Sequence, residues 1–398
     1  MDSSTDMTPS AGTNIELLRK ARGFSREALA SMANLSPSHL RKVETGERAL
    51  TPPVAAAIAA AMHVSPARIY GQPFLGPVEQ SDLLNDLRDA VRRYRMPNVE
   101  VPDLEQLRTD LNDLSDLRAG TKYMEMLRVL PTLLAQVTAT AIASHGDAIA
   151  WEQVADAYGC AYSVAHRLGQ PDLAEMIVSR HQWAAQQTWN PNAEAGASWI
   201  EAGVFQSAGD YASGLAVVDR GIVQLESSGA RQIDHVISLG SLHLRGVVLA
   251  SRHKDKALAE QHSAKAYALA ASLPQDADHL RHNLTFGTAN TILHDLASKV
   301  ELDKPDKADE MATPLLDAPP AGLRPSRLAH LFIDTARARL ARGDYSGAEE
   351  ALRRAFAVAP QMSEVHPMAR EVLRVLFLLH QRSKPELMAM AKRAGLAS

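Results

Sequence analysis

Helix-forming residues dominate this chain from end to end, and they leave almost no place for a sheet. Ala, Leu, Arg and Glu fill the periodic segments, whereas Val, Ile and the aromatic residues do not alternate with polar residues over any useful stretch. Proline and glycine fall between the periodic segments, where they begin or end helices. The pattern predicts an all-α protein, and a length of 398 residues allows two or three domains with a large core.

A first block of short helices is expected at residues 13–72, because capping residues recur there at short intervals. Serine or threonine precedes four of the predicted helices, and proline follows the cap in three of them. The five predicted helices are 14–22, 26–32, 37–45, 52–62 and 66–70, with N-caps at Ser25, Ser36, Thr51 and Ser65. The predicted core of this block is Ile15, Leu18, Leu29, Ala30, Leu40, Val43, Val54, Ile58 and Ile69.

Basic charge is concentrated in this block, although the whole chain has a net charge of −4. Residues 13–72 hold eight Lys and Arg residues against four acidic ones. Such an asymmetry is typical of a head that meets phosphates and a body that does not. The alternative is that these basic residues only solvate a small helical domain.

The same block resembles the Cro/repressor-type helix-turn-helix family, also called the XRE family. The matching run is IELLRKARGFSREALASMANLSPSHLRKVETGERALTPPVAAAIAAAMHVSPARIYG, in which apolar, cap and glycine positions agree with the family in register. One departure is Arg26, where the family usually has glutamine; arginine keeps the ability to donate to phosphate. The resemblance implies a five-helix DNA-binding head whose third helix, 37–45, is the recognition helix.

The exposed side of this helix carries the candidate DNA contacts. Leu40 and Val43 would face the core. The side chains left free are Pro37, Ser38, Arg41 and Lys42, with His39 at the edge. The resemblance implies that Pro37, Ser38 and Lys42 read bases in the major groove, where Lys42 can donate to guanine O6 and N7.

Further contacts are expected to reach the DNA backbone. The resemblance implies that Arg26, Arg48 and Thr51 contact phosphates and position the head without reading sequence. Glu44 is different, because an acidic side chain is repelled by DNA. We expect it to form a structural ion pair with Arg19.

The rest of the chain also has helical periodicity. Residues 73–146 are predicted to be a helical linker, with helices at 79–95, 103–118 and 121–144. Residues 147–398 are predicted to form helical hairpins, whose turns recur at 168–171, 208–211 and 342–345, with weaker copies near 253–257, 302–308 and 382–385. One helix pair cannot bury its own apolar face, so the repeats predict a stacked solenoid.

This body resembles the tetratricopeptide-repeat sensor domains that are fused to such heads. The Gly-Asp-Tyr turn of the repeat occurs at Gly209 and Gly343, although the period of about 34 residues is not kept. The resemblance implies a concave face that binds a peptide or a small-molecule effector.

The most suggestive stretch for such a ligand is 279–299, which we expect to be helical. Asn283 and Asn290 lie seven residues apart and would share one helix face, where their amides could clamp a peptide backbone. The other candidate ligand contacts are His294 on the same helix and His243 and Arg245 on the preceding one. The alternative is that all five are ordinary polar residues between helices.

Other classes of protein are disfavoured. The single cysteine, Cys160, excludes an intrachain disulfide and lies in an apolar stretch, where we expect a buried thiol. Residues 1–12 are expected to be a disordered tail, and the longest apolar run noted, 54–62, is too short to span a membrane. No phosphate loop, zinc motif or nucleophile elbow occurs, so we expect no enzyme, cofactor or metal site.

These patterns predict a cytoplasmic, sequence-specific DNA-binding transcriptional regulator. One head buries too little surface for tight specific binding, so we expect a homodimer on an inverted repeat of double-stranded DNA. A peptide or small-molecule effector in the body would gate it. The alternative from another class is a protein-interaction scaffold whose helix-turn-helix head is not used for specific DNA binding.

Overall fold

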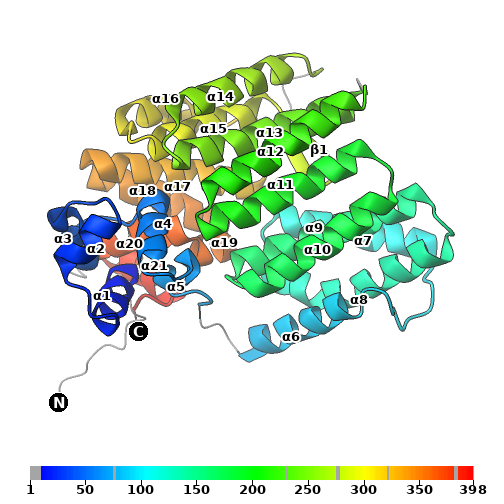
Figure 1. The fold of residues 1–398 in the computed structure, drawn as a ribbon, viewed down its shortest axis with the longest axis horizontal. Helices are drawn as coiled ribbons and strands as arrows, with labels where there is room; N and C mark the ends of the chain where they lie inside the picture. Colours follow the sequence, from blue (N-terminus) through cyan, green and yellow to red (C-terminus); the bar gives the residue numbers. More distant parts are fainter. Residues whose placement is uncertain are drawn as a thin grey trace.

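The computed structural model describes residues 10–74, 78–229, 232–274, 278–320, 322–380 and 384–397, and it confirms the all-α expectation apart from one short hairpin. Figure 1 shows a small head of short helices at one side of a larger body of stacked helices. The chain of the body curls back, so that α18, α20 and α21 near the C-terminus lie beside the head.

The head contains the five predicted helices, which are α1 (Ala11–Ala21), α2 (Arg26–Met32), α3 (Pro37–Glu44), α4 (Pro52–Ala61) and α5 (Pro66–Tyr70). The side chains of three of the four predicted caps, Ser25, Ser36 and Ser65, each accept a hydrogen bond from a backbone N–H three residues later. Thr51 stands at the cap of α4 but makes no such bond. Of the predicted core, Leu18 and Val54 are only partly buried, and the other seven residues are buried.

The first helix begins earlier than expected, because α1 starts at Ala11 with Ser10 as its cap. Ala11 and Gly12, which we assigned to the tail, are buried. A side chain on Gly12 would lie 2.7 Å from the backbone oxygen of Glu44, so glycine lets α1 approach the end of α3. The remaining predicted tail residues, 1–9, lie outside the described residues.

The predicted linker is part of the body. Its helices, α6 (Val78–Arg92), α7 (Leu104–Ala119) and α8 (Tyr123–Ala143), match the expected positions. Leu87, Leu107 and Leu127 are nevertheless buried in one continuous core with α9 and the C-terminal helices. A segment that shares a core in this way is held in place by burial of its apolar side chains, so α6, α7 and α8 pack as part of the body.

The hairpins of the body follow in order. They are formed by α9 (Ala148–Arg167), α10 (Pro171–Gln187), α11 (Pro191–Ala208), α12 (Tyr211–Ser227), α13 (Ile233–Arg252), α14 (Lys256–Ala271), α15 (Thr288–Glu301), α16 (Pro305–Asp317), α17 (Pro325–Arg342), α18 (Tyr345–Val358), α19 (Pro360–Val365), α20 (Pro367–Leu379) and α21 (Pro385–Arg393). Gly169, Gly209 and Gly343 have left-handed φ angles of 69°, 78° and 81° at the predicted turns. Of the weakest predicted turn, residues 382 and 383 lie outside the described residues.

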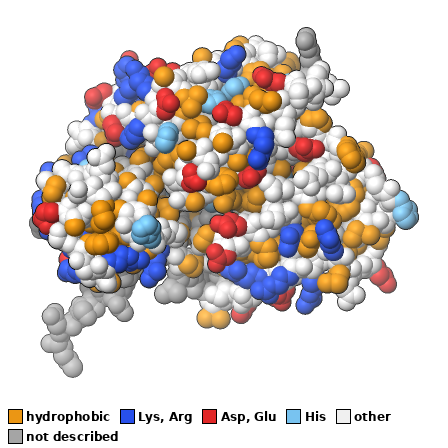
Figure 2. All heavy atoms as spheres, viewed as in Figure 1, with side chains coloured by type: hydrophobic (Ala, Val, Ile, Leu, Met, Phe, Trp, Pro, Cys, Tyr) orange, Lys and Arg blue, Asp and Glu red, His pale blue; other side chains and the backbone are white. Residues whose placement is uncertain are grey.

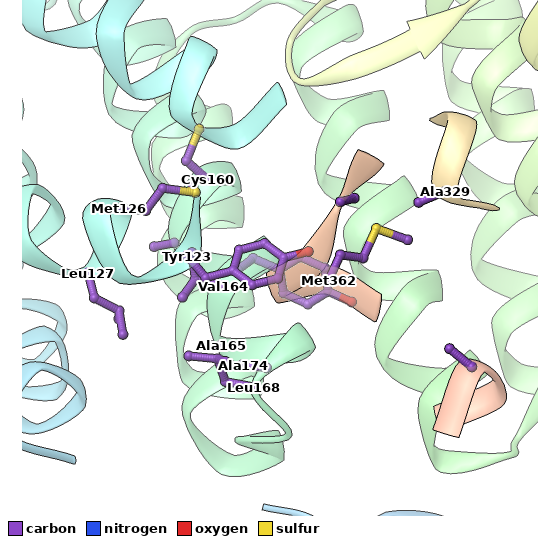
Figure 3. Packing of buried hydrophobic residues seen from close by; sticks show 14 of the residues in the cluster. Tyr123, Met126, Leu127, Cys160, Val164, Ala165, Leu168, Ala174, Ala329 and Met362 are labelled. Atoms are coloured by element: carbon purple, nitrogen blue, oxygen red, sulfur yellow. The ribbon is translucent and has the colours of Figure 1, made fainter. Parts of the chain in front are cut away.

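Figure 3 shows part of the core in which helices from the beginning of the body pack against helices near its end. Tyr123 of α8, Cys160 of α9 and Met362 of α19 belong to one buried cluster. The Cys160 thiol is buried, as expected, and burial raises its pKa to about 11. A thiol with so high a pKa is an inert part of the core at neutral pH.

The predicted helix at 279–299 is wrong in its first half. Residues 279–281 and 284–286 form the antiparallel strands β1 (His279–Arg281) and β2 (Leu284–Phe286), and α15 begins only at Thr288. His282 and Asn283 make the turn with φ angles of 46° and 60°, a left-handed pair that suits a two-residue hairpin. Phe286 is fully buried against Gly240 of α13, and this burial fixes the hairpin.

Two helices, α8 and α13, are long and apolar enough to cross a membrane by length and composition, although the sequence singled out only 54–62. Their apolar windows are 56% and 72% buried inside the protein. Core helices of a folded protein have the same composition, so these two carry no evidence for a membrane span.

Candidate DNA interface and central cavity

The recognition helix presents the side that the sequence predicted. Leu40 and Val43 are fully buried, whereas Pro37, Ser38 and Lys42 are exposed. The Lys42 ammonium forms no ion pair with any described residue. On the face drawn in Figure 2, acidic and basic side chains are interspersed over the body, so no single sign of charge covers that face.

Arg41 and His39 are more restricted. The Arg41 guanidinium donates to both oxygens of Glu47, over 2.6 and 2.9 Å, in an exposed pair. His39 is half-buried, and burial, with Arg48 as a smaller cause, lowers its pKa. Asp303, in the turn between α15 and α16, opposes this shift, so His39 lies where the recognition helix faces the body.

The expected ion pair of Glu44 is confirmed. Its carboxylate accepts from Arg19 Nε over 2.7 Å and from Arg26 Nε over 2.8 Å, and the Glu44 side chain is only 2% exposed. Arg26, a predicted phosphate contact, is therefore held in place by Glu44 while its side chain stays 34% exposed. The other predicted backbone contacts lie after α3, with Arg48 exposed and Thr51 half-buried.

The loop after the recognition helix is hydrogen-bonded to α20 of the body and packs against it. The backbone N–H of Leu50 donates to Glu371 Oε2 over 3.1 Å, and Glu371 pairs with Arg374 over 2.8 Å. The Arg374 side chain in turn packs against Gly46, whose φ angle is 81°. Because these residues lie more than 300 positions apart, sequence patterns gave no sign of the contact.

A second contact joins the head to the hairpin turns of the body. A side chain on Gly209 would lie 2.6 Å from the Cβ atom of Ala56 in α4, and one on Gly169 would lie 2.9 Å from the Cβ atom of Gln72. The turn glycines that marked the repeats in the sequence therefore also allow the head to dock closely.

A cavity of about 440 Å³ lies between this docked head and the body. Ser65, Tyr70 and Gln72 line it from the head, and α9, α11, α13, α15 and α17 line it from the body. Among the described residues, seven arginines but three carboxylates border it. Burial, with nearby arginines as a smaller cause, lowers the pKa of the lining residues His166 and His294 to about 3, so both are neutral at pH 7.

The structure separates the five candidate ligand residues into two groups. Arg245, Asn283 and His294 line the cavity, whereas His243 and Asn290 do not. Nδ1 of His243 lies 2.9 Å from Nδ1 of His262 between α13 and α14. Asn290 donates to the backbone oxygen of Thr285 over 2.6 Å and so ties α15 to the hairpin.

The expected helical clamp of two asparagines is therefore wrong. Asn283 lies in the hairpin turn, packs over Gly159 of α9 and donates to the backbone oxygen of Asp156 over 2.7 Å. In sequence, a spacing of seven residues is compatible both with one helix face and with a hairpin that precedes a helix. The left-handed φ angles of His282 and Asn283 show that the structure contains the hairpin. Within the ranges that the structure describes, no three His, Cys, Asp or Glu side chains form a metal-binding group.

Comparison with known proteins identifies the head. Residues 15–69 match the helix-turn-helix family. No curated protein matches the chain. Among solved structures, BtubC from P. vanneervenii is similar, with 15% identity, 66% of this chain and 94% of that chain covered, and a TM-score of 0.39.

Two further solved structures are similar at the same level. PlcR of Bacillus thuringiensis, solved with the peptide PapR7 and DNA, has 14% identity over 66% of this chain and 94% of its own, with a TM-score of 0.24. The PrgX/iCF10 complex has 9% identity over 88% of this chain and 97% of its own, with a TM-score of 0.32. At TM-scores this low, residues of these structures cannot be matched one by one to residues of this chain.

Proposed function

We propose, from the premise that residues 15–69 are a helix-turn-helix domain, that this protein is a sequence-specific DNA-binding transcriptional regulator that works in the cytoplasm and has no catalytic role. The observation that carries the proposal is the free side of α3. Ser38 and Lys42 are exposed on it although the head is docked on the body. A docked head that left this side covered could not enter a DNA groove.

The side chains of α3 have separate roles in the proposal. Pro37, Ser38 and Lys42 read base edges in the major groove, with His39 and Arg41 at the border of the contact. The phosphate contacts come from Arg26, Arg48 and Thr51. Because Glu44 holds Arg26 by its Nε, the outer nitrogens of the guanidinium are presented in a fixed direction.

We propose further that the protein binds an inverted repeat as a homodimer. A single head of this class buries less surface than tight specific binding needs, and two recognition helices spaced by one DNA turn make up the difference. Mass photometry of the free protein and of its complex with a selected duplex tests this. Two copies per duplex are expected, and tight binding by one copy contradicts it.

The body is proposed to gate the head through a peptide or small ligand. The supporting observation is that Tyr70 and Gln72 of the head share one cavity wall with the body helices. A ligand bound there contacts both parts and changes the free energy of docking, which shifts the orientation of α3.

Selection from a pool of random duplexes tests the function itself. A regulator enriches one recurring sequence at about 0.15 M salt, and Lys42→Ala changes base preference at defined positions. Arg26→Ala weakens binding to all sequences alike and flattens the salt dependence. A scaffold with an unused head retains no sequence at that salt concentration.

A further inference from the structure

The charges around the central cavity do not balance. Of its three carboxylates, Asp334 accepts from Arg337 over 2.9 Å, and Glu301 lies 3.1 Å from Arg337 and 3.4 Å from Arg252. The third, Glu175, is exposed to solvent. The five other lining arginines form no ion pair with a described carboxylate, and they are Arg118, Arg167, Arg245, Arg324 and Arg327.

Three of these arginines use neutral partners instead. Arg118 donates to the backbone oxygen of Asn283 over 3.3 Å, and Arg245 donates to Oε1 of Gln206 over 2.8 Å. The Arg245 guanidinium also lies 3.7 Å above the ring of Trp199. Arg167 lies 3.0 Å from Nε2 of His330. Neutral partners orient the guanidinium groups but leave their charge uncompensated.

Several buried donors of the lining residues have no hydrogen-bond partner among the described residues. Nε of Arg118, Nε of Arg245 and Nη1 of Arg324 are buried and unpaired, and so is the hydroxyl of Tyr70. Each unpaired buried donor costs about 1–3 kcal/mol. Folded proteins keep such groups mainly where a ligand or a function uses them.

The arginines also repel one another. Burial, with Arg252, Arg327 and Arg167 as smaller causes, lowers the pKa of Arg245 to about 10. Burial and the charges of Arg167 and Arg118 lower the pKa of Arg327 to about 10 as well, and the nearby Asp278 opposes this shift only in part. Both guanidinium groups still carry a full charge at pH 7, so the cavity is cationic under ordinary conditions.

We infer that the central cavity binds a compact organic molecule with at least two anionic groups, carboxylate or phosphate, between Arg245 on α13 and Arg327 on α17. A volume of about 440 Å³ is within the usual range for small-molecule sites. Trp199, Leu293 and Met362 supply apolar wall for the carbon skeleton. The inference names the effector class of the proposed regulator, and its effect on DNA rests on that proposed function.

The anion would also tie the head to the body. Tyr70, the last residue of α5, lines the cavity from the head, so a bound ligand contacts the wall that this side chain forms. Binding therefore adds a contact that exists only when the head is docked. An anion with such a contact favours the docked orientation of the recognition helix.

Titration calorimetry with the full-length protein tests the site. Citrate represents polycarboxylates and pyrophosphate represents phosphates, while acetate and sodium chloride at matched ionic strength are the controls. One of the two oligoanions is expected to bind and to raise the Tm by about 3 °C or more at saturation. Which of them binds decides between carboxylate and phosphate. If neither exceeds the controls, the inference is overturned.

Substitutions locate the site. Arg245→Gln and Arg327→Gln are each expected to raise the Kd at least about tenfold, because one charge-assisted hydrogen bond is lost. Arg353→Gln is the matched control, since Arg353 is exposed on α18 and pairs with Glu350 of the same helix. Unchanged affinity in both cavity variants contradicts the assignment. Circular dichroism checks that each variant folds.

A DNA measurement separates this inference from the proposed function. Fluorescence anisotropy with a selected duplex is recorded with and without the bound oligoanion. A changed DNA affinity that Arg327→Gln abolishes supports the coupling, and an unchanged affinity refutes it. If the oligoanion binds but no duplex is ever selected, the site stands and the regulator proposal fails.

Discussion

Two basic surfaces of this protein differ in how they hold their charge. On α3 and in the loop after it, Lys42 and Arg48 are exposed to solvent, so the head carries these charges at little cost. In the cavity, Arg245 and Arg327 lie deep inside without carboxylate partners. The comparison teaches that exposed charges suit a long polyanion, whereas enclosed and uncompensated charges suit a small one that enters and neutralises them.

The head also shows the opposite treatment of a buried arginine. The Arg19 side chain is only 8% exposed, yet Glu44 neutralises it within the same domain. Pairing makes Arg19 part of the folded structure, and the lack of pairing makes Arg327 a candidate for binding.

The largest effect is expected for Glu44→Ala. It leaves Arg19 buried without a partner and releases Arg26, which should destabilise the head by about 3–5 kcal/mol. Hydrogen exchange of residues 11–70 measures the loss. All four tryptophans lie in the body, so their fluorescence should report an unfolding transition that changes much less. An unchanged exchange rate in the head refutes the structural role of Glu44.

Charge reversal on the recognition helix should have the next largest effect. Lys42→Glu is expected to weaken binding to a selected duplex about 100-fold, because a base contact is lost and a phosphate repulsion is gained. Lys265→Glu makes the same charge change at an exposed side chain of α14 and should leave the affinity within about twofold. Equal losses in the two variants would mean that net charge alone governs DNA binding.

Acid should destabilise the body before the head. Burial lowers the pKa of His181 and His243 to about 4, and that of His166 and His294 to about 3. These imidazoles take up protons on unfolding once the pH falls below their unfolded value of about 6.5, so the stability is present above that pH and is lost as the pH falls toward 4.

The expected loss is at least about 1 kcal/mol between pH 6.5 and 5.5. Urea unfolding followed by tryptophan fluorescence measures it, and His181→Asn should reduce the pH dependence by close to one proton. A body whose stability is constant over this range contradicts the burial of neutral histidines.

The smallest expected effect is the change in stability when Arg327, an arginine without an ion pair to a described carboxylate, is replaced. Arg327→Met should stabilise the protein without ligand by about 1 kcal/mol, because it removes a buried charge that forms no ion pair with a described carboxylate and keeps the apolar stem. Differential scanning calorimetry in a buffer without oligoanions gives the Tm. A lower Tm for this variant would show that Arg327 is needed for folding, in the way that Glu44 is.

The head could be predicted from sequence because the contacts that define it are local. Ser25 and Ser36 cap the helices that immediately follow them, and Glu44 meets Arg19 within the same short block. The start of α1 was missed because Gly12 is helical for a tertiary reason, its close approach to α3. Local patterns contain no information on such a contact.

The cavity could not be predicted for the same physical reason. Arg118 and Arg327 lie on α7 and α17, and only the curl of the body brings them together. Arg245 was recognised, but as part of a peptide clamp that assumed a helix at Asn283, where a hairpin turn is found. The helices of 73–146 were predicted well, whereas their packing into the body core depends on partners far along the chain.

The central claim is that the free side of α3 reads DNA sequence while the head is docked on the body. The most direct test is to select duplexes from one random pool in parallel with the unmodified protein and with a Ser38→Ala, Lys42→Ala double variant. The account predicts one enriched motif for the unmodified protein and a relaxed preference at particular positions for the variant. Identical motifs from both proteins, or no motif from either, would contradict it.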